Sequence, residues 1–130
     1  MDKKKSKWDS KGFGFDTDFY RRKDWLTLRK RMFEQSPVCE LSANHGIIKP
    51  TTVIDHIIPR RILQDLELEQ DNLQGLSQQE HYNKSGLERD IKTLDDFIKE
   101  LQTGKLQYVC TPEKKEKLFL LLKEKGLLLQ

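Results

Sequence analysis

Three polar residues, Asp55, His56 and His81, are of the chemical types that metal-assisted cleavage of a phosphodiester requires. Asp55 and His56 follow an apolar β-branched run in V-I-D-H-I-I-P, and His81 comes later in E-H-Y-N-K-S. A carboxylate is a hard ligand for a cation, and an imidazole titrates near neutral pH. Together they supply a metal site for the phosphate charge and a base that activates water. Taken without its neighbours, His56 is better explained as a buried histidine with a satisfied hydrogen bond.

The length and composition of the chain predict one small domain. Its 130 residues have room for one modest core, and they are 35% apolar and 35% charged, so the chain is polar without being plainly disordered. Cys39 and Cys110 are far apart and carry no paired motif, which favours a reducing cytoplasm over a disulfide framework. The apolar stretch 118–122 is too short to span a bilayer, and no signal segment follows the basic start. We expect a cytoplasmic protein without a membrane partner.

Positive charge is concentrated near the N-terminus. The net charge is +3, but residues 1–31 alone hold 11 Lys and Arg against 5 Asp. This asymmetry is typical of an arm or face that binds a polyanion, and an ordinary solvated tail is the alternative. The basic residues that we predict to bind nucleic acid are Arg22, Lys23, Arg29, Lys30, Arg60 and Arg61.

The first part of the chain predicts one long helix between irregular segments. Residues 1–15 are interpreted as a flexible arm because Gly12 and Gly14 oppose regular structure. Residues 18–35 carry one apolar stripe at helical spacing, and Ser36-Pro37 ends that helix. Residues 38–50 are expected to be loop, with a turn at Asn44-His45-Gly46.

Two strands and a helix are predicted around the polar residues. The β-branched run 51–54 and the stretch 73–76 indicate strands, with a loop or short helical turn between them. The sequence S-Q-Q-E at 77–80 is a capping-box pattern that starts a helix. Helical spacing then places His81 and Lys84 on one face of that helix.

Two further helices are expected in the C-terminal part. Thr93 can cap the first, and Gly104 ends it. Thr111-Pro112 starts the second, with proline at the first helical position, and Gly126 ends it. These two helices are predicted to form a helical hairpin.

The order of these motifs resembles the HNH endonuclease family, in particular its small phage-encoded members. The motifs are W-x-x-L-R, Cys39, D-H-I-I-P, D-N-L-Q-x-L and H-x-x-K-S, which span roughly residues 19–86. The fold class that the resemblance implies is α+β: a ββα-metal (HNH) finger with an N-terminal helix and a C-terminal helical hairpin. The expected parts are a flexible basic arm at 1–15, an HNH nuclease domain at 16–90 and a helical extension at 91–130.

The resemblance implies a role for each residue of the site. His56 would be the general base that takes a proton from the attacking water. Asp55 and His81 would hold one divalent cation, Mg²⁺ first and Mn²⁺ or another transition metal as the alternatives. Asn72 would tie the loop between the strands together and help orient His56. Lys84 would contact a phosphate or stabilise the transition state, and a surface charge is its alternative.

The strand prediction carries a geometric condition. Neighbouring residues of a regular strand point to opposite faces of the sheet. Asp55 and His56 would therefore address one phosphate only if the strand bends or bulges between them. Pro59 makes a break nearby plausible.

The chain departs from the phage relatives at the structural zinc. Many of those relatives carry two C-x-x-C pairs, whereas here the corresponding stretches read C-E-L-S at 39–42 and S-Q-Q-E at 77–80. One thiolate cannot make a tetrahedral zinc site, so no structural zinc is predicted. The capping box of Ser77 and Glu80 would instead hold the start of the helix.

Two functions are weighed. The first is a metal-dependent endonuclease that nicks or cuts duplex DNA, encoded by a phage or mobile element, with a phage packaging (terminase) protein as a further partner and the host cytoplasm as its location. The second is a catalytically inactive DNA-binding or partner-regulating module on the same scaffold. The intact set of Asp55, His56, Asn72 and His81 favours the enzyme.

Overall fold

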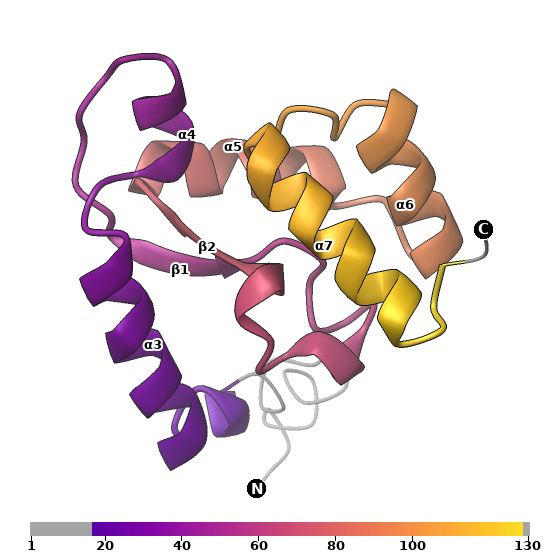
Figure 1. The fold of residues 1–130 in the computed structure, drawn as a ribbon, viewed down its shortest axis with the longest axis horizontal. Coiled ribbons are helices and arrows are strands. Elements are labelled where there is room, and N and C mark those ends of the chain that lie inside the picture. The colour runs from indigo at the N-terminus through magenta and orange to yellow at the C-terminus, as the bar shows by residue number, and fades with distance from the viewer. Residues whose placement is uncertain (1–16, 129–130) are drawn as a thin grey trace, which may run out of the picture.

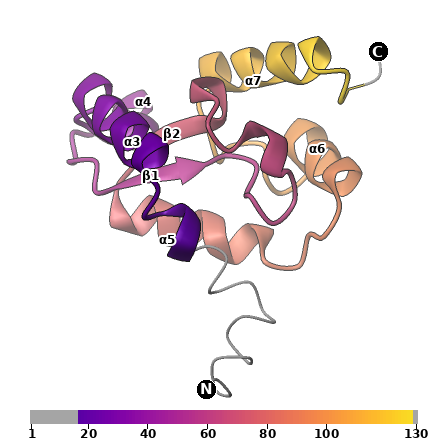
Figure 2. The same ribbon diagram turned by 90° about the horizontal axis from the view of Figure 1, so that it is seen from below.

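A small antiparallel sheet lies at the centre of the protein. The computed structural model describes residues 17–128, so the predicted arm at 1–15 lies outside the described residues. The sheet consists of β1 (Val53–His56) and β2 (Leu73–Leu76). Helices surround it, with α5 (Gln78–Glu88) on one side and α7 (Pro112–Glu124) on the other (Figures 1 and 2). The fold is thus a mixture of helices and a two-stranded sheet.

The predicted N-terminal helix is shorter than expected. It forms α3 (Lys23–Gln35) and buries Trp25, Leu28 and Met32, the stripe that the spacing indicated. Residues 17–19 make a separate helical turn, and Arg22 is extended with ψ at 144°. The helix therefore starts at residue 23 and not at 18. The buried stripe packs on the sheet, where it shares a core with Ile54 and Leu73.

The segment between α3 and the sheet was predicted wrongly as loop throughout. It contains the five-residue helix α4 (Glu40–Asn44), which is too short to show a helical period in the sequence. The turn that follows is confirmed, because Gly46 has a φ of +79° in the left-handed region that glycine tolerates.

The strand propensity of the sequence predicted the bounds of β2 correctly and those of β1 only in part. β2 is confirmed at 73–76, whereas β1 runs two residues later than the predicted 51–54. Its limits follow the pairing, in which Asp55 lies opposite Gln74 and His56 opposite Leu73. Pairing with a partner strand thus overrides the weak strand preference of Asp and His. The connection contains two short 3₁₀ turns, η1 (Gln64–Leu66) and η2 (Gln70–Asn72).

The predicted caps at three helix starts are confirmed. The hydroxyl of Ser77 accepts a hydrogen bond from a backbone N–H in the first turn of α5. Thr93 does the same for α6 (Leu94–Thr103), and Thr111 for α7, where Pro112 is the first helical residue. Each such cap contributes about 1 kcal/mol to stability.

The largest apolar core joins the C-terminal helices to the loop that follows β1. Phe97 and Leu101 of α6 and Leu118 and Leu122 of α7 are fully buried in the same cluster as Ile57. Full burial of each such side chain stabilises the fold by roughly 1.5–3 kcal/mol. This core therefore anchors the chain directly after the Asp-His pair.

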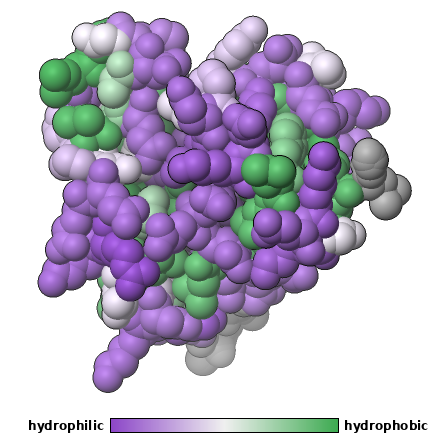
Figure 3. Space-filling view, in the orientation of Figure 1, coloured by the Kyte–Doolittle hydropathy of each residue, from purple (hydrophilic) through white to green (hydrophobic). Residues whose placement is uncertain are grey.

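The outer face over α3 and α7 is mostly hydrophilic (Figure 3). Hydrophobic side chains gather in small patches, one of them in the region of α4 and the loop after it. Over residues 17–128, none of the helices combines the length and the apolar character that crossing a membrane requires.

Candidate active site

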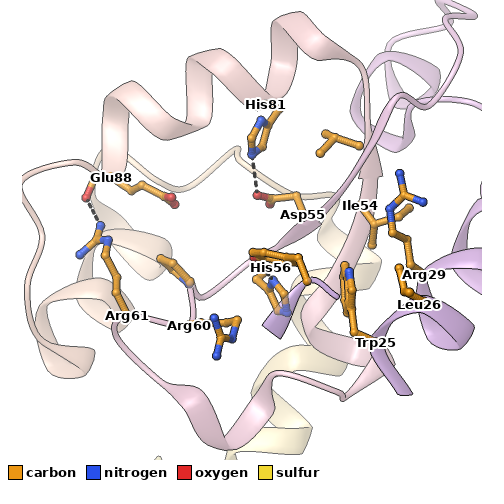
Figure 4. Close-up of a pocket in the computed structure, with 13 residues that line it drawn as sticks. Trp25, Leu26, Arg29, Ile54, Asp55, His56, Arg60, Arg61, His81 and Glu88 are labelled. Carbon is orange, nitrogen blue, oxygen red and sulfur yellow. Dashed lines mark hydrogen bonds and ion pairs between the residues drawn. The ribbon is translucent and has the colours of Figure 1, made fainter. Parts of the chain in front are cut away.

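A cleft of about 610 Å³ runs along β1 and is lined by three of the predicted site residues, Asp55, His56 and His81. All four β1 residues line it, so the cleft is open to both faces of the strand. Helix α3 forms one wall with Trp25, Leu26 and Arg29, and α5 forms the other with His81 and Glu88 (Figure 4). The cleft thus brings Asp55, His56 and His81 together.

The edge position explains how two neighbouring strand residues reach one cleft. His56 points toward α3, where its ring stacks on Trp25 with 5.1 Å between ring centroids. Asp55 points toward α5, where its Oδ1 lies 3.6 Å from Nε2 of His81. The pairing of β1 with β2 is continuous from residue 53 to 56, so the bend or bulge expected between them is absent from this register. Among residues 17–128, no third strand pairs with the outer edge of β1, and both faces of the strand meet there.

One carboxylate oxygen of Asp55 is held by two donors, and the other faces the cleft. Its carboxylate is 6% exposed. The Oδ2 atom accepts a hydrogen bond of 3.0 Å from Gln74 and lies 3.2 Å from the ammonium of Lys84. The Oδ1 atom faces His81. The carboxylate is therefore held on one side and free for a ligand on the other.

The donor atoms of Asp55 and His81 fit a divalent cation. A carboxylate oxygen and an imidazole nitrogen 3.6 Å apart can both contact one ion at the usual bond lengths of about 2.0–2.2 Å. Within residues 17–128, no group of three or more His, Cys, Asp or Glu side chains is arranged to hold a metal. Two protein ligands with water and phosphate completing the shell suit Mg²⁺ or Mn²⁺, which keep several such ligands.

His56 presents a basic nitrogen to the cleft. Its Nε2 lies 2.9 Å from the backbone carbonyl oxygen of Glu67. A carbonyl only accepts, so Nε2 carries the proton and Nδ1 of the neutral ring holds the lone pair. The Nδ1 atom is 3.5 Å from the hydroxyl of Tyr20. Burial lowers the pKa of His56, while the Glu67 carbonyl and Asp55 oppose this in part. The ring is therefore unprotonated at neutral pH.

Asn72 is completely buried behind the cleft. Its Oδ1 accepts from the N–H of Ile58 at 2.9 Å, and its Nδ2 donates to the carbonyl of Ile58 at 3.1 Å. A longer contact of 3.5 Å joins Nδ2 to the carbonyl of Leu66, the neighbour of Glu67. Asn72 thus ties together the two ends of the loop that carries the His56 partner, and its complete burial keeps it out of the cleft.

Lys84 also lies behind the cleft. Its side chain is 1% exposed, and its ammonium contacts the carbonyl of His56 at 3.1 Å and the carboxylates of Glu88 and Asp55 at 2.6 and 3.2 Å. Burial lowers the pKa of Lys84, but the two carboxylates outweigh burial and the pKa lies above its usual value. These three partners use the donors of the charged ammonium. This placement does not provide the phosphate contact expected of Lys84.

The predicted basic residues separate into groups. Arg29 and Arg61 are exposed and line the cleft. Arg60 lines it too, but its side chain is 3% exposed, pairs with Glu67 and lies over the ring of Phe19. The remaining three, Arg22, Lys23 and Lys30, are exposed outside the cleft lining.

The stretches that correspond to the two C-x-x-C pairs of the phage relatives, 39–42 and 77–80, meet at the start of α5. Burial raises the pKa of the Cys39 thiol, but hydrogen bonds from Ser42 and Ser77 outweigh burial and hold the pKa below its usual value. The four positions hold one thiol, two hydroxyls and the carboxylate of Glu80, a set that does not match the four thiolate or imidazole ligands of a structural zinc. The residues present therefore do not fit that metal.

Two residues of the site were missed in the sequence. Gln74 is fully buried in β2 and donates from Nε2 to Asp55 and to the carbonyl of Val109. Glu88 lines the cleft and pairs with Lys84 four residues earlier. A polar residue in the middle of a buried strand and an i, i+4 charge pair were the available signals.

Comparison with known proteins finds a similar solved structure but no similar sequence family. The chain matches no protein-family model and no curated protein sequence. Among solved structures it is similar to the HNH endonuclease of the deep-sea thermophilic bacteriophage GVE2, determined with a manganese ion. The TM-score is 0.57 and the identity 26%, over 68% of this chain and 96% of the phage chain.

This structural similarity relates the chain to the HNH endonuclease family. The similarity indicates a nuclease. It extends over nearly all of the phage endonuclease, while about a third of this chain is not matched.

Proposed function

We propose that this protein is a metal-dependent endonuclease that hydrolyses phosphodiester bonds of DNA through a ββα-metal unit made of β1, β2 and α5. The observation that carries the proposal is the convergence on one cleft of Asp55 and His81, 3.6 Å apart, with a His56 ring whose Nε2 is engaged by the Glu67 carbonyl. This is a ligand pair for a cation beside a base.

The residues divide the work of hydrolysis. A water molecule beside His56 gives a proton to Nδ1, and the hydroxide oxygen attacks phosphorus while the bond to the leaving oxygen breaks. Glu67 keeps the ring in the required tautomer by accepting from Nε2. Asp55 and His81 would hold the divalent cation, which supplies charge neutralisation at the phosphate and at the leaving oxygen. The relative in the solved structure was determined with manganese, in keeping with a divalent ion.

DNA is the proposed substrate. Arg29 lines the cleft and is exposed, so it is available to contact a phosphate near the cleavage point. Arg61 is also exposed at the cleft, but its guanidinium donates to the backbone carbonyls of Glu88 and Ile91. Phosphate contacts recognise the DNA backbone and predict cleavage with little sequence specificity. The phage origin and the packaging (terminase) partner implied by the resemblance stay predictions.

Nicking of supercoiled plasmid tests the proposal. Wild-type protein should convert plasmid to open circles with Mg²⁺ or Mn²⁺ and not with EDTA. His56→Ala should lower the rate by roughly 10²–10⁴-fold, the usual contribution of a general base. His45→Ala is the matched control, because His45 is exposed after α4 and lies outside the cleft lining. Equal nicking by the wild type and His56→Ala would reject the enzyme, and retained DNA binding without nicking would favour the inactive module.

A further inference from the structure

Lys84 is an ionisable group in the interior that the proposed chemistry leaves without a part. Its side chain is 1% exposed, and it lies behind Asp55 and not in the cleft. A buried ammonium costs free energy unless charged or polar partners surround it. Here the partners are Asp55, Glu88 and the carbonyl of His56. Two of those three belong to the pair on β1 that does the proposed chemistry.

The direction of the Asp55 carboxylate depends on two donors. The terminal torsion of an aspartate is soft, so an unheld carboxylate turns easily. Gln74 reaches Oδ2 from β2, and Lys84 reaches the same oxygen from α5. With both donors on Oδ2, the plane of the carboxylate is set and Oδ1 faces His81.

We infer that Lys84 is a positioning residue that, together with Gln74, aims Oδ1 of Asp55 at the cation and ties Asp55 to the backbone of His56. This inference rests on the proposed metal site. Outer partners of this kind orient a ligand that would otherwise sample several directions. Because one ammonium contacts both Asp55 and His56, it also maintains the spacing between the ligand and the base.

Binding of Mn²⁺ alone, measured by calorimetry on the folded chain, tests this role without DNA or turnover. Lys84→Met keeps an unbranched side chain as far as the Cε atom and removes the ammonium. We expect its Kd for Mn²⁺ to be about 10–100-fold weaker than that of the wild type, the usual effect of losing an outer partner. Lys115→Met is the matched control, because the Lys115 ammonium is likewise tied to the backbone, here to two carbonyls, but lies outside this cleft. Its Kd should stay at the wild-type value.

A merely structural Lys84 predicts a different result. Lys84→Met would then be less stable, as Lys115→Met is expected to be, and yet bind Mn²⁺ with the wild-type Kd once folded. An unchanged or tighter Kd in folded Lys84→Met would overturn the inference. A tighter Kd would mean that removing a positive charge near the cation outweighs any loss of orientation.

A second variant covers the case in which Lys84→Met does not fold. Gln74→Leu removes the other donor to Oδ2 and leaves the buried charges in place. It should also weaken Mn²⁺ binding by about tenfold or more, and a wild-type Kd in folded Gln74→Leu would refute the positioning of Oδ2. Failure of the proposed function has a different signature: wild-type protein that neither binds Mn²⁺ nor nicks plasmid. That result would remove the metal site itself.

Discussion

Replacement of Asn72 by alanine should destabilise the protein strongly, although Asn72 touches neither the cation ligands nor the cleft. The variant leaves the N–H and the carbonyl of Ile58 without their partners at 2.9 and 3.1 Å, and both lie in the interior. An orphaned buried polar group costs about 1–3 kcal/mol, so the two together cost about 2–6 kcal/mol. That is a large part of the roughly 5–15 kcal/mol by which domains are stable.

Urea unfolding followed by circular dichroism measures this loss. Asn83→Ala is the matched control, since Asn83 is exposed on α5 and its side chain bonds only to Gln79 among the described side chains. The control should change the free energy of unfolding by less than about 0.5 kcal/mol. A loss below about 1 kcal/mol in Asn72→Ala would refute the reasoning, because it would mean that Ile58 finds other partners.

The Asn72→Asp variant makes the test sharper. An ionised carboxylate accepts from the N–H of Ile58 but cannot donate to its carbonyl, whereas a protonated carboxyl does both. The destabilisation of Asn72→Asp relative to wild type should therefore shrink as the pH falls and the new carboxyl gains its proton. A difference that is constant or grows toward acid would show that the donated bond at Ile58 is unimportant.

Further predictions address the caps, the thiols, DNA binding and metal content. Ser77→Ala should cost about 1 kcal/mol, as should Thr93→Ala at the start of α6, but only Ser77→Ala should also slow nicking, because α5 carries His81, a proposed cation ligand. Equal nicking by the two variants would show that the cap does not affect the site. Burial raises the pKa of Cys110 to about 11, so its thiol is neutral at pH 8. The thiol should therefore resist iodoacetamide in the native protein and react in urea. Rapid labelling of this residue in the native protein would contradict its burial. Arg29→Ala should weaken DNA binding and lower the salt slope by about 1, more than Arg31→Ala, which is exposed on the same helix outside the cleft; equal slopes in a filter-binding titration would remove Arg29 from the interface. Purified protein should contain well below about one zinc per chain, and chelator should barely change its melting temperature. Stoichiometric zinc would show that the residues at 39–42 and 77–80 do hold a structural zinc.

The sequence predicted correctly those features that depend only on neighbouring residues, namely the helix caps and the apolar stripe of α3. A cap depends on one hydroxyl and the N–H groups of the next turn, so Ser77, Thr93 and Thr111 were identified from their own neighbourhoods. The stripe of α3 was visible because it repeats over several turns. The five-residue α4 and the break at Arg22 carry no such repeat, and they were missed.

The bounds of β1, the strand that carries Asp55 and His56, could not be predicted from neighbouring residues alone. β-Branched residues indicated a strand at 51–54, but the paired residues are 53–56, because the extent of β1 depends on β2 across the sheet. The same tertiary arrangement removed the need for a bulge. A sheet of two strands leaves an open edge, and α3 and α5 place their side chains on its two faces.

The sequence by itself determined the chemical content of this protein: a carboxylate, two imidazoles and an amide in the order of the HNH endonucleases, and too few thiols for a zinc knuckle. These are matters of residue type and spacing. Only the tertiary structure decided the direction of each group. It made Nε2 of His56 the donor to Glu67, committed one oxygen of Asp55 to Gln74 and Lys84, and buried the ammonium of Lys84. The reason is that a side chain's hydrogen-bond partners come from segments distant in the chain, and those partners set its orientation and charge.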